Sequence, residues 1–444
     1  MGRDDGGRRA MKRVLYATTA LVVAGLTAGN ASAASGLKLG ITGFFRNAIG
    51  ASWGNGPQAT FPAATGFSTA GLNSFGRQDV SMRQEIRVNF TGETTLDNGI
   101  TVGVLVGLNG ENVMKSGNTT QVNRAYADFS GRFGMVRIGE TDSALGTDCV
   151  ADPGNVTSNF GLNSPNESFS NVGLKVVRNQ FAGTITPTNP PTLPSYLGTV
   201  GVAPVGAIGT CFGLESKGNR SNKILYFSPS FGGLTFGVSF SPQAGSRFAG
   251  GGLAYGTDVQ APVAGAPANV LAVAADYVHD FGDWYLTLGG GGEWAFTEYT
   301  AAGATNPNKP SWYQAGAQIG IGHWSLGASG AYYLDYKQAG FAGTTATSND
   351  DGWVATAGLN YSLGDVAVGL QGMYSQWQQA GTAGDEKVWG LSLNSTYAYG
   401  PGINLEAQFA YTAANYGGAA AAPFFTGLPP VHAIEVDLGT AINF

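Results

Sequence analysis

The chain has few charged residues, little cysteine or histidine, and no long apolar run beyond its first residues. Asp, Glu, Lys and Arg make up 12% of its 444 residues, about half the share usual in soluble proteins. Residues 34–444 contain no stretch near the roughly 18 continuous apolar residues that a membrane-spanning helix needs. These shortages argue against a set of soluble domains and against a helical membrane protein.

Glycine and aromatic residues are abundant instead. The chain has 70 Gly, 24 Phe, 18 Tyr and 8 Trp. The glycines follow no Gly-X-Y period, and so many aromatic residues exclude a collagen-like or disordered chain.

The N-terminal segment has the three parts of a secretory signal peptide. Starting at Met11, a basic pair precedes an apolar stretch from Val14 to Ala28 and a small-residue site that ends at Ala33. We therefore expect residues 1–33 to be removed, although Arg8-Arg9 leaves a twin-Arg signal as an alternative. Cleavage removes five of 23 basic and two of 29 acidic residues, which leaves 18 and 27 and a net charge of −9.

Seven tight turns each separate two segments in which apolar and polar residues alternate with a period of two. The turns are Asp97-Asn98-Gly99, Gly131 to Gly134, Ser230 to Gly233, Phe281-Gly282-Asp283, Gly320 to His323, Leu363-Gly364-Asp365 and Gly400-Pro401-Gly402. Together with a first strand near Gly36 to Ile49 and a last strand from about Val431, they predict sixteen strands. Short turns at one end and long loops at the other are typical of an all-β, 16-stranded antiparallel transmembrane barrel over residues 34–444.

The alternation also predicts which side chains face the interior. In the second strand, Val80, Met82 and Ile86 would face lipid, whereas Arg83, Glu85 and Arg87 would face a wet interior. Trp284 and Trp294 share one face and are about 25 Å apart in membrane height, which is the expected apolar band. The alternative of a soluble β-protein would need a second packing layer, and no helical segment supplies one.

The third long link, about residues 142–219, is far longer than the others and is expected to be functional. It carries five acidic residues against Lys175, Arg178 and Lys217. Cys149 and Cys211 also lie in it, and in an oxidising periplasm we expect them to form a disulfide worth roughly 4 kcal/mol. Two unpaired thiols are the alternative.

The whole mature chain resembles the general diffusion porins of Gram-negative outer membranes, in particular the porin group common in alphaproteobacteria. The resemblance rests on the hairpin from Asn123 to Gly139, the oversized third loop and the terminal Phe444. It implies a homotrimer, a third loop folded into the barrel, and a C-terminal aromatic signal for the barrel assembly machinery. By position, the basic wall of the constriction would be Arg46, Arg83, Arg87, Arg124 and Arg137, and its acidic side Asp142, Asp148, Asp152 and Glu167.

Such opposed charges in a water-filled passage would favour small hydrophilic solutes and ions, and the acidic excess predicts a weak preference for cations. The alternative for each arginine is pairing with a wall carboxylate such as Glu85. Two other functional classes remain open: a substrate-selective channel, and a structural or adhesive barrel with a plugged interior.

We expect no enzyme activity, no cofactor and no nucleic-acid partner. His279, His323 and His432 are too far apart along the strands to form one site with a nucleophile or a zinc ion. The glycine run Gly289 to Gly292 has no following helix to bind phosphate. Calcium bound by loop acids, at Asp350-Asp351 or Asp385-Glu386, is the one ligand left open.

Overall fold

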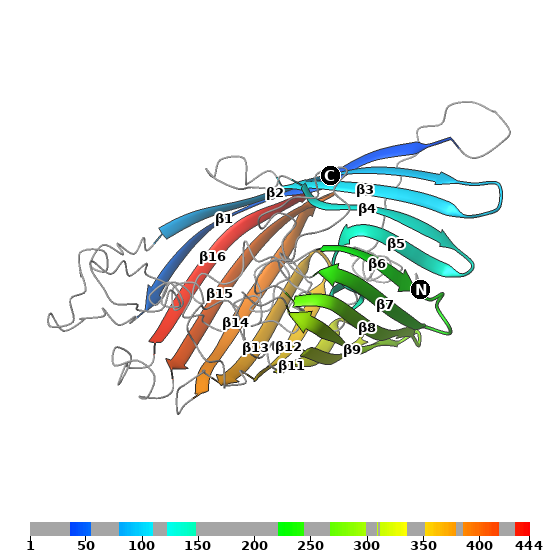
Figure 1. Ribbon diagram of the computed structural model, residues 1–444. Coiled ribbons are helices and arrows are strands. Elements are labelled where there is room, and N and C mark those ends of the chain that lie inside the picture. The colour runs from blue at the N-terminus through cyan, green and yellow to red at the C-terminus, as the bar shows by residue number, and fades with distance from the viewer. Residues whose placement is uncertain are drawn as a thin grey trace, which may run out of the picture.

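The protein is a closed barrel of sixteen antiparallel strands (Figure 1). The computed structural model describes residues 36–54, 80–109, 122–147, 221–243, 267–298, 309, 311–334, 351–378, 385–416 and 431–444. The strands are β1 (Lys38–Gly54), β2 (Val80–Thr95), β3 (Thr101–Asn109), β4 (Val122–Gly131), β5 (Gly134–Thr141), β6 (Ser221–Phe227), β7 (Leu234–Gln243), β8 (Pro267–Asp280), β9 (Trp284–Glu298), β10 (Ser311–Ile321), β11 (Trp324–Leu334), β12 (Gly352–Leu363), β13 (Val366–Gln378), β14 (Asp385–Gly400), β15 (Ile403–Tyr416) and β16 (Val431–Asn443). The predicted strand number and order are confirmed. The first strand ends at Gly54, five residues later than expected.

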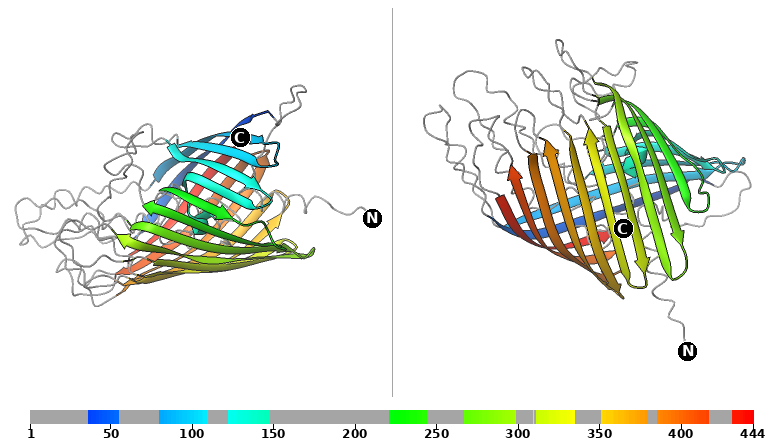
Figure 2. Two further views of the ribbon diagram at one scale, coloured as in Figure 1. Left: turned by 45° about the vertical axis from the view of Figure 1, so that its right-hand side comes forward. Right: turned by 90° about the horizontal axis from the view of Figure 1, so that it is seen from below.

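The seven tight turns lie together at one end of the barrel (Figure 2). Gly99 has a φ of 80° and donates its N–H to Leu96 O at 2.9 Å, while Asn98 Oδ1 accepts a bond from Ile100 N. Gly282 has a φ of 95° and bonds Asp280 Oδ1 through its N–H at 2.8 Å. Because positive φ costs glycine little, the Gly-containing tripeptides reverse the chain in very few residues.

The first and last strands close the barrel. β1 pairs with β16 from Phe44↔Asn443 to Gly54↔Ala433. Beyond this ladder, Gly43 N donates to Phe444 O at 2.8 Å and Phe444 N to Gly43 O at 3.0 Å. A Cβ on Gly43 would lie 2.2 Å from Arg87 O and 2.8 Å from the Phe444 ring. The terminal residue therefore extends the seam that leaves the sheet without an open edge.

The two faces of the wall differ as the alternation predicts. On β2, Met82 is 81% exposed and Phe90 46%, whereas Glu85 is 4% exposed. Val104 and Val106 of β3 also point outward. No helix in the described part of the chain is long and apolar enough to cross a membrane.

Aromatic side chains gather on the outer face at both ends of the strands. Phe281 and Trp284 stack 4.0 Å apart next to a tight turn. At the opposite end, Trp294 Nε1 donates to Tyr313 Oη at 2.8 Å, and Trp353 stacks on Tyr374. The predicted placement of Trp284 and Trp294 on one outward face is confirmed, because both belong to the outward set of β9.

Candidate functional site

Two arginines and one glutamate form the first charged cluster on the inner face, on β1 and β2. Arg46 and Glu85 are Cα partners across the two strands. Glu85 lies 3.5 Å from Arg46 Nη1 and 3.6 Å from Arg87 Nη2. Both guanidinium groups also lie over the Phe44 ring, at 4.0 and 5.1 Å from its centroid. The aromatic face and the shared carboxylate hold two like charges side by side.

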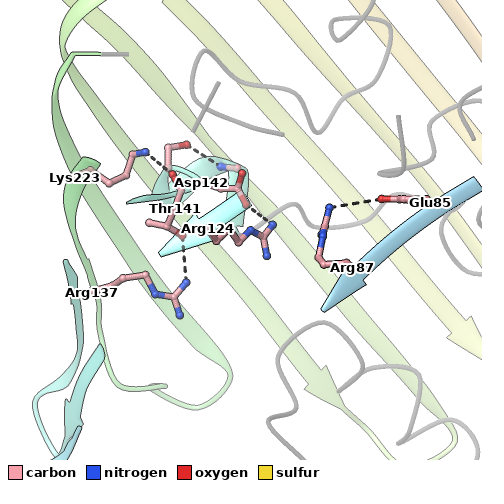
Figure 3. Close-up of polar contacts among 9 residues, drawn as sticks. Glu85, Arg87, Arg124, Arg137, Thr141, Asp142 and Lys223 are labelled. Atoms are coloured by element: carbon pink, nitrogen blue, oxygen red, sulfur yellow. Dashed lines mark hydrogen bonds and ion pairs between the residues drawn. The ribbon is translucent and has the colours of Figure 1, made fainter. Parts of the chain in front are cut away.

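The second cluster lies on β4 and β5. Arg137 makes a two-pronged contact with Asp128, with Nε–Oδ1 at 2.6 Å and Nη2–Oδ2 at 2.9 Å, and its guanidinium covers the Tyr126 ring at 3.8 Å. Arg124 Nη2 donates to Asp142 Oδ2 at 2.6 Å. Because Asp142 is the first residue of the long third link, this bond joins that link to the wall (Figure 3).

The start of the third link turns into the barrel and is anchored there. The buried Lys223 on β6 donates to the backbone oxygens of Thr141 and Ser221. Ser143 Oγ bonds the fully buried Glu293 of β9. The short helix α2 (Ala144–Thr147) then packs against β6 to β9. We call Thr141, Asp142, Ser143, Lys223 and Glu293 the loop anchor.

Glycines on the wall leave the space that α2 fills. A Cβ on Gly237 would lie 2.4 Å from the Phe227 ring and 3.3 Å from Ala144 Cβ. A Cβ on Gly291 would lie 2.9 Å from Leu145 Cδ1. Ser239 Oγ accepts the Ala144 N–H at 3.0 Å, and Gln314 donates to Leu145 O at 3.4 Å. Residues 142–147 thus lie inside the barrel, as expected for the beginning of the third loop.

A group of carboxylates lines the inner face of β15 and β16. Glu406 is 6% exposed, Glu435 0% and Asp437 3%. Neither strand contains Lys or Arg. A Cβ on Gly50 would lie 2.0 Å from Asp437 Oδ1, so a glycine on β1 makes room for this carboxylate.

Four of the five predicted arginines have described side chains, and each of these four contacts a carboxylate. Arg46, Arg87, Arg124 and Arg137 all face the interior, and three of the four bond wall carboxylates while Arg124 bonds the third link. Arg83 lies opposite Ala48 in the β1–β2 register, and its side chain is not described. Residues 1–33, Asp148, Asp152, Glu167, Cys149 and Cys211 lie outside the described residues, as does Asp350.

Sequence reasoning missed Lys223, Glu293 and Glu406. Lys223 follows from the same period-two rule that placed the arginines, because β6 reads buried at every odd residue from Ser221 to Phe227. What the alternation could not supply is the partner of each side chain. That depends on the register between strands and on where the third link turns inward.

A family model matches most of this chain. The model described as Gram-negative porin matches residues 17–416. Comparison with curated protein sequences gives no significant match.

Among solved structures, the anion-selective porin from Comamonas acidovorans is similar at 16% identity and a TM-score of 0.54, covering 92% of this chain and 100% of that one. OmpT of Vibrio cholerae in its trimer form has 10% identity and a TM-score of 0.52 at the same coverage. The outer-membrane channel DcaP of Acinetobacter baumannii has 13% identity and a TM-score of 0.51, covering 94% and 100%. At these identities the structural likeness concerns the fold.

Proposed function

Because this chain belongs to the family of Gram-negative porins and is an outer-membrane channel, we propose that small hydrophilic solutes and ions diffuse through it with a weak preference for cations. Its strands cross the outer membrane many times, with the tight turns on the periplasmic side. The charged clusters line the inner face, so a passing ion meets side chains rather than lipid.

The observation that carries the cation preference is the position of Glu406, Glu435 and Asp437. These three carboxylates lie on two neighbouring strands that contain no Lys or Arg. The arginines of the neighbouring strands also face carboxylates: Arg124 and Arg137 each bond one, Arg46 and Arg87 share Glu85, and Arg46 interacts electrostatically with Glu406 as well. Since an excess of one charge sign acts on ions within about 10 Å at 0.1 M salt, the acidic excess of these two strands should set the sign of a weak, salt-dependent selectivity.

The fold alone does not fix this sign. The Comamonas porin is described as anion-selective although it shares the barrel architecture. Selectivity therefore has to come from the side chains of each lumen, and in this chain the β15 and β16 set is acidic.

A reversal potential measured across a potassium chloride gradient tests the proposal. We expect a cation preference at low salt that fades as salt rises. The triple variant Glu406→Gln, Glu435→Gln and Asp437→Asn should lose it. The matched control Asp97→Asn, Asp283→Asn and Asp365→Asn removes the same charge from exposed turn residues and should keep it. Anion preference in the unmodified protein at low salt would contradict the proposal.

We propose further that the channel is a homotrimer and catalyses no reaction. The trimer form of the Vibrio OmpT structure supports the first point. For the second, His279 packs between Tyr277 and Phe281, His323 Nδ1 contacts Ser362 O at 2.8 Å, and His432 stacks on Tyr411. These histidines lie at three separate places on the described barrel, so they do not combine into one site of the kind a hydrolase needs.

A further inference from the structure

The inner wall is divided into a charged sector and a neutral sector. The sequences of β10, β11, β12 and β13 contain no Asp, Glu, Lys or Arg. Among the amide side chains of the neutral sector and its β14 and β15 margin, we call four buried ones the amide quartet: Asn360, Gln371, Asn394 and Gln408.

All four amides face the lumen. Each has a chain neighbour that points outward and is strongly exposed, namely Leu359 at 41%, Leu370 at 53%, Leu393 at 49% and Phe409 at 49%. Because side chains alternate along a strand, the amides between them point inward. Their own exposure is between 1% and 3%.

The quartet is contiguous across four strands. Asn394 of β14 and Gln408 of β15 are direct Cα partners. Gly369 of β13 pairs with Asn394 on one side and with Asn360 of β12 on the other. Gln371 follows two residues after Gly369 on the same face. Since glycine carries no side chain, Gly369 places no side chain of its own between Asn360 and Asn394.

Most of the polar atoms of the quartet have no hydrogen-bond partner among the described residues. Both side-chain atoms of Gln371 and of Gln408 are unpartnered, as are Asn360 Oδ1 and Asn394 Oδ1. The nitrogens of Asn360 and Asn394 donate to Ser362 and Ser392, which fixes their orientation. Two glutamines nearby on β10 differ, because Gln314 bonds Leu145 O and Gln318 bonds Tyr285 Oη. Buried polar groups left unpaired are costly, so the quartet is suited to an external partner.

The chemistry of the quartet selects that partner. An amide offers both donors and acceptors, and a hydroxyl group also does both. A phosphate or carboxylate solute would need a basic residue, whereas the nearest charged neighbour in register is the acidic Asp437, the Cα partner of Gln408. We propose that the amide quartet is a binding subsite for an uncharged polyhydroxyl solute, such as a monosaccharide, on its way through the channel.

The test uses single channels in a planar bilayer and rests on the proposed channel function. Glucose is added to potassium chloride at increasing concentration, and polyethylene glycol of similar hydrodynamic radius serves as the non-binding solute. We expect glucose to reduce the current in a saturable manner and the polymer to act only by dilution of the electrolyte. The variant Gln371→Met and Gln408→Met keeps side-chain volume and should raise the half-saturating glucose concentration at least about tenfold.

Gln318→Met is the matched control, because it replaces an inward glutamine that already has a partner, and its glucose response should be unchanged. If the double variant does not insert, each single variant carries the test with an expected weakening of about threefold. A glucose effect no different from that of the polymer would overturn the subsite, and so would equal saturation in the double variant. Absence of any potassium chloride conductance would instead refute the channel function.

Discussion

Arg124 and Asp142 provide a sharp test of how the third loop is held. Their contact is 2.6 Å long, and the side chains are 31% and 9% exposed. Two unit charges about 4 Å apart interact by about 4 kcal/mol at an effective dielectric near 20. Solvent around the partly exposed arginine screens part of this, so we expect a coupling free energy of about 1–3 kcal/mol.

A double-mutant cycle measures that coupling. The variants are Arg124→Gln, Asp142→Asn and the two together, with urea unfolding in detergent followed by tryptophan fluorescence. Asp142 has further contacts, so Asp142→Asn alone should lower the free energy of unfolding by more than the coupling free energy. Arg132→Gln serves as a control, because Arg132 is exposed in a tight turn. Bilayer recordings of the same variants should show noisier open-channel current where the pair is broken.

The reasoning fails if the coupling free energy falls below about 0.5 kcal/mol. In that case the contact would be a surface-like ion pair with little effect on stability. It also fails if the Arg132 control changes channel noise as much as the Asp142 variant does.

The remaining predictions concern packing, the cysteines and assembly. Gly237→Ala should destabilise the barrel by about 1–3 kcal/mol because its Cβ would lie 2.4 Å from the Phe227 ring. Gly103→Ala, whose Cβ would have its nearest contact at 3.7 Å, should be tolerated, and thermal unfolding of the two variants compares them. Mass mapping without reductant should find Cys149 joined to Cys211, and two alkylatable thiols would end that prediction. An unheated sample on a denaturing gel should migrate as a trimer, and monomer migration without heating would count against a stable homotrimer.

The barrel could be predicted from sequence because one rule governs it. Period-two alternation and turns such as Asp97-Asn98-Gly99 specify strand, face and reversal locally. The rule does not give the C-terminal end of β1. Residues Ala51 to Gly54 continue to pair with β16 although the apolar alternation weakens there. Pairing with a neighbouring strand extends an element beyond its own sequence signal.

The sequence predicts which charged residues face the interior, but it does not predict which of them contact one another. Arg46 and Arg87 were placed correctly on the inner face, but their shared bond to Glu85 depends on the β1–β2 register. The anchoring of Ser143 by Glu293 joins residues 150 positions apart. The amide quartet likewise exists only because Gly369 brings β12 and β14 residues to either side of it. No local pattern encodes such long-range neighbours.

Single-channel conductance of the purified protein in a planar bilayer tests the central claim most directly. A diffusion porin should produce stepwise, ohmic conductance that increases nearly in proportion to potassium chloride concentration, because ions cross a wet lumen without tight binding. Insertion without conductance steps would contradict the account and favour a plugged, structural or adhesive barrel. Conductance that saturates at low salt would contradict free diffusion and favour a channel dedicated to one substrate.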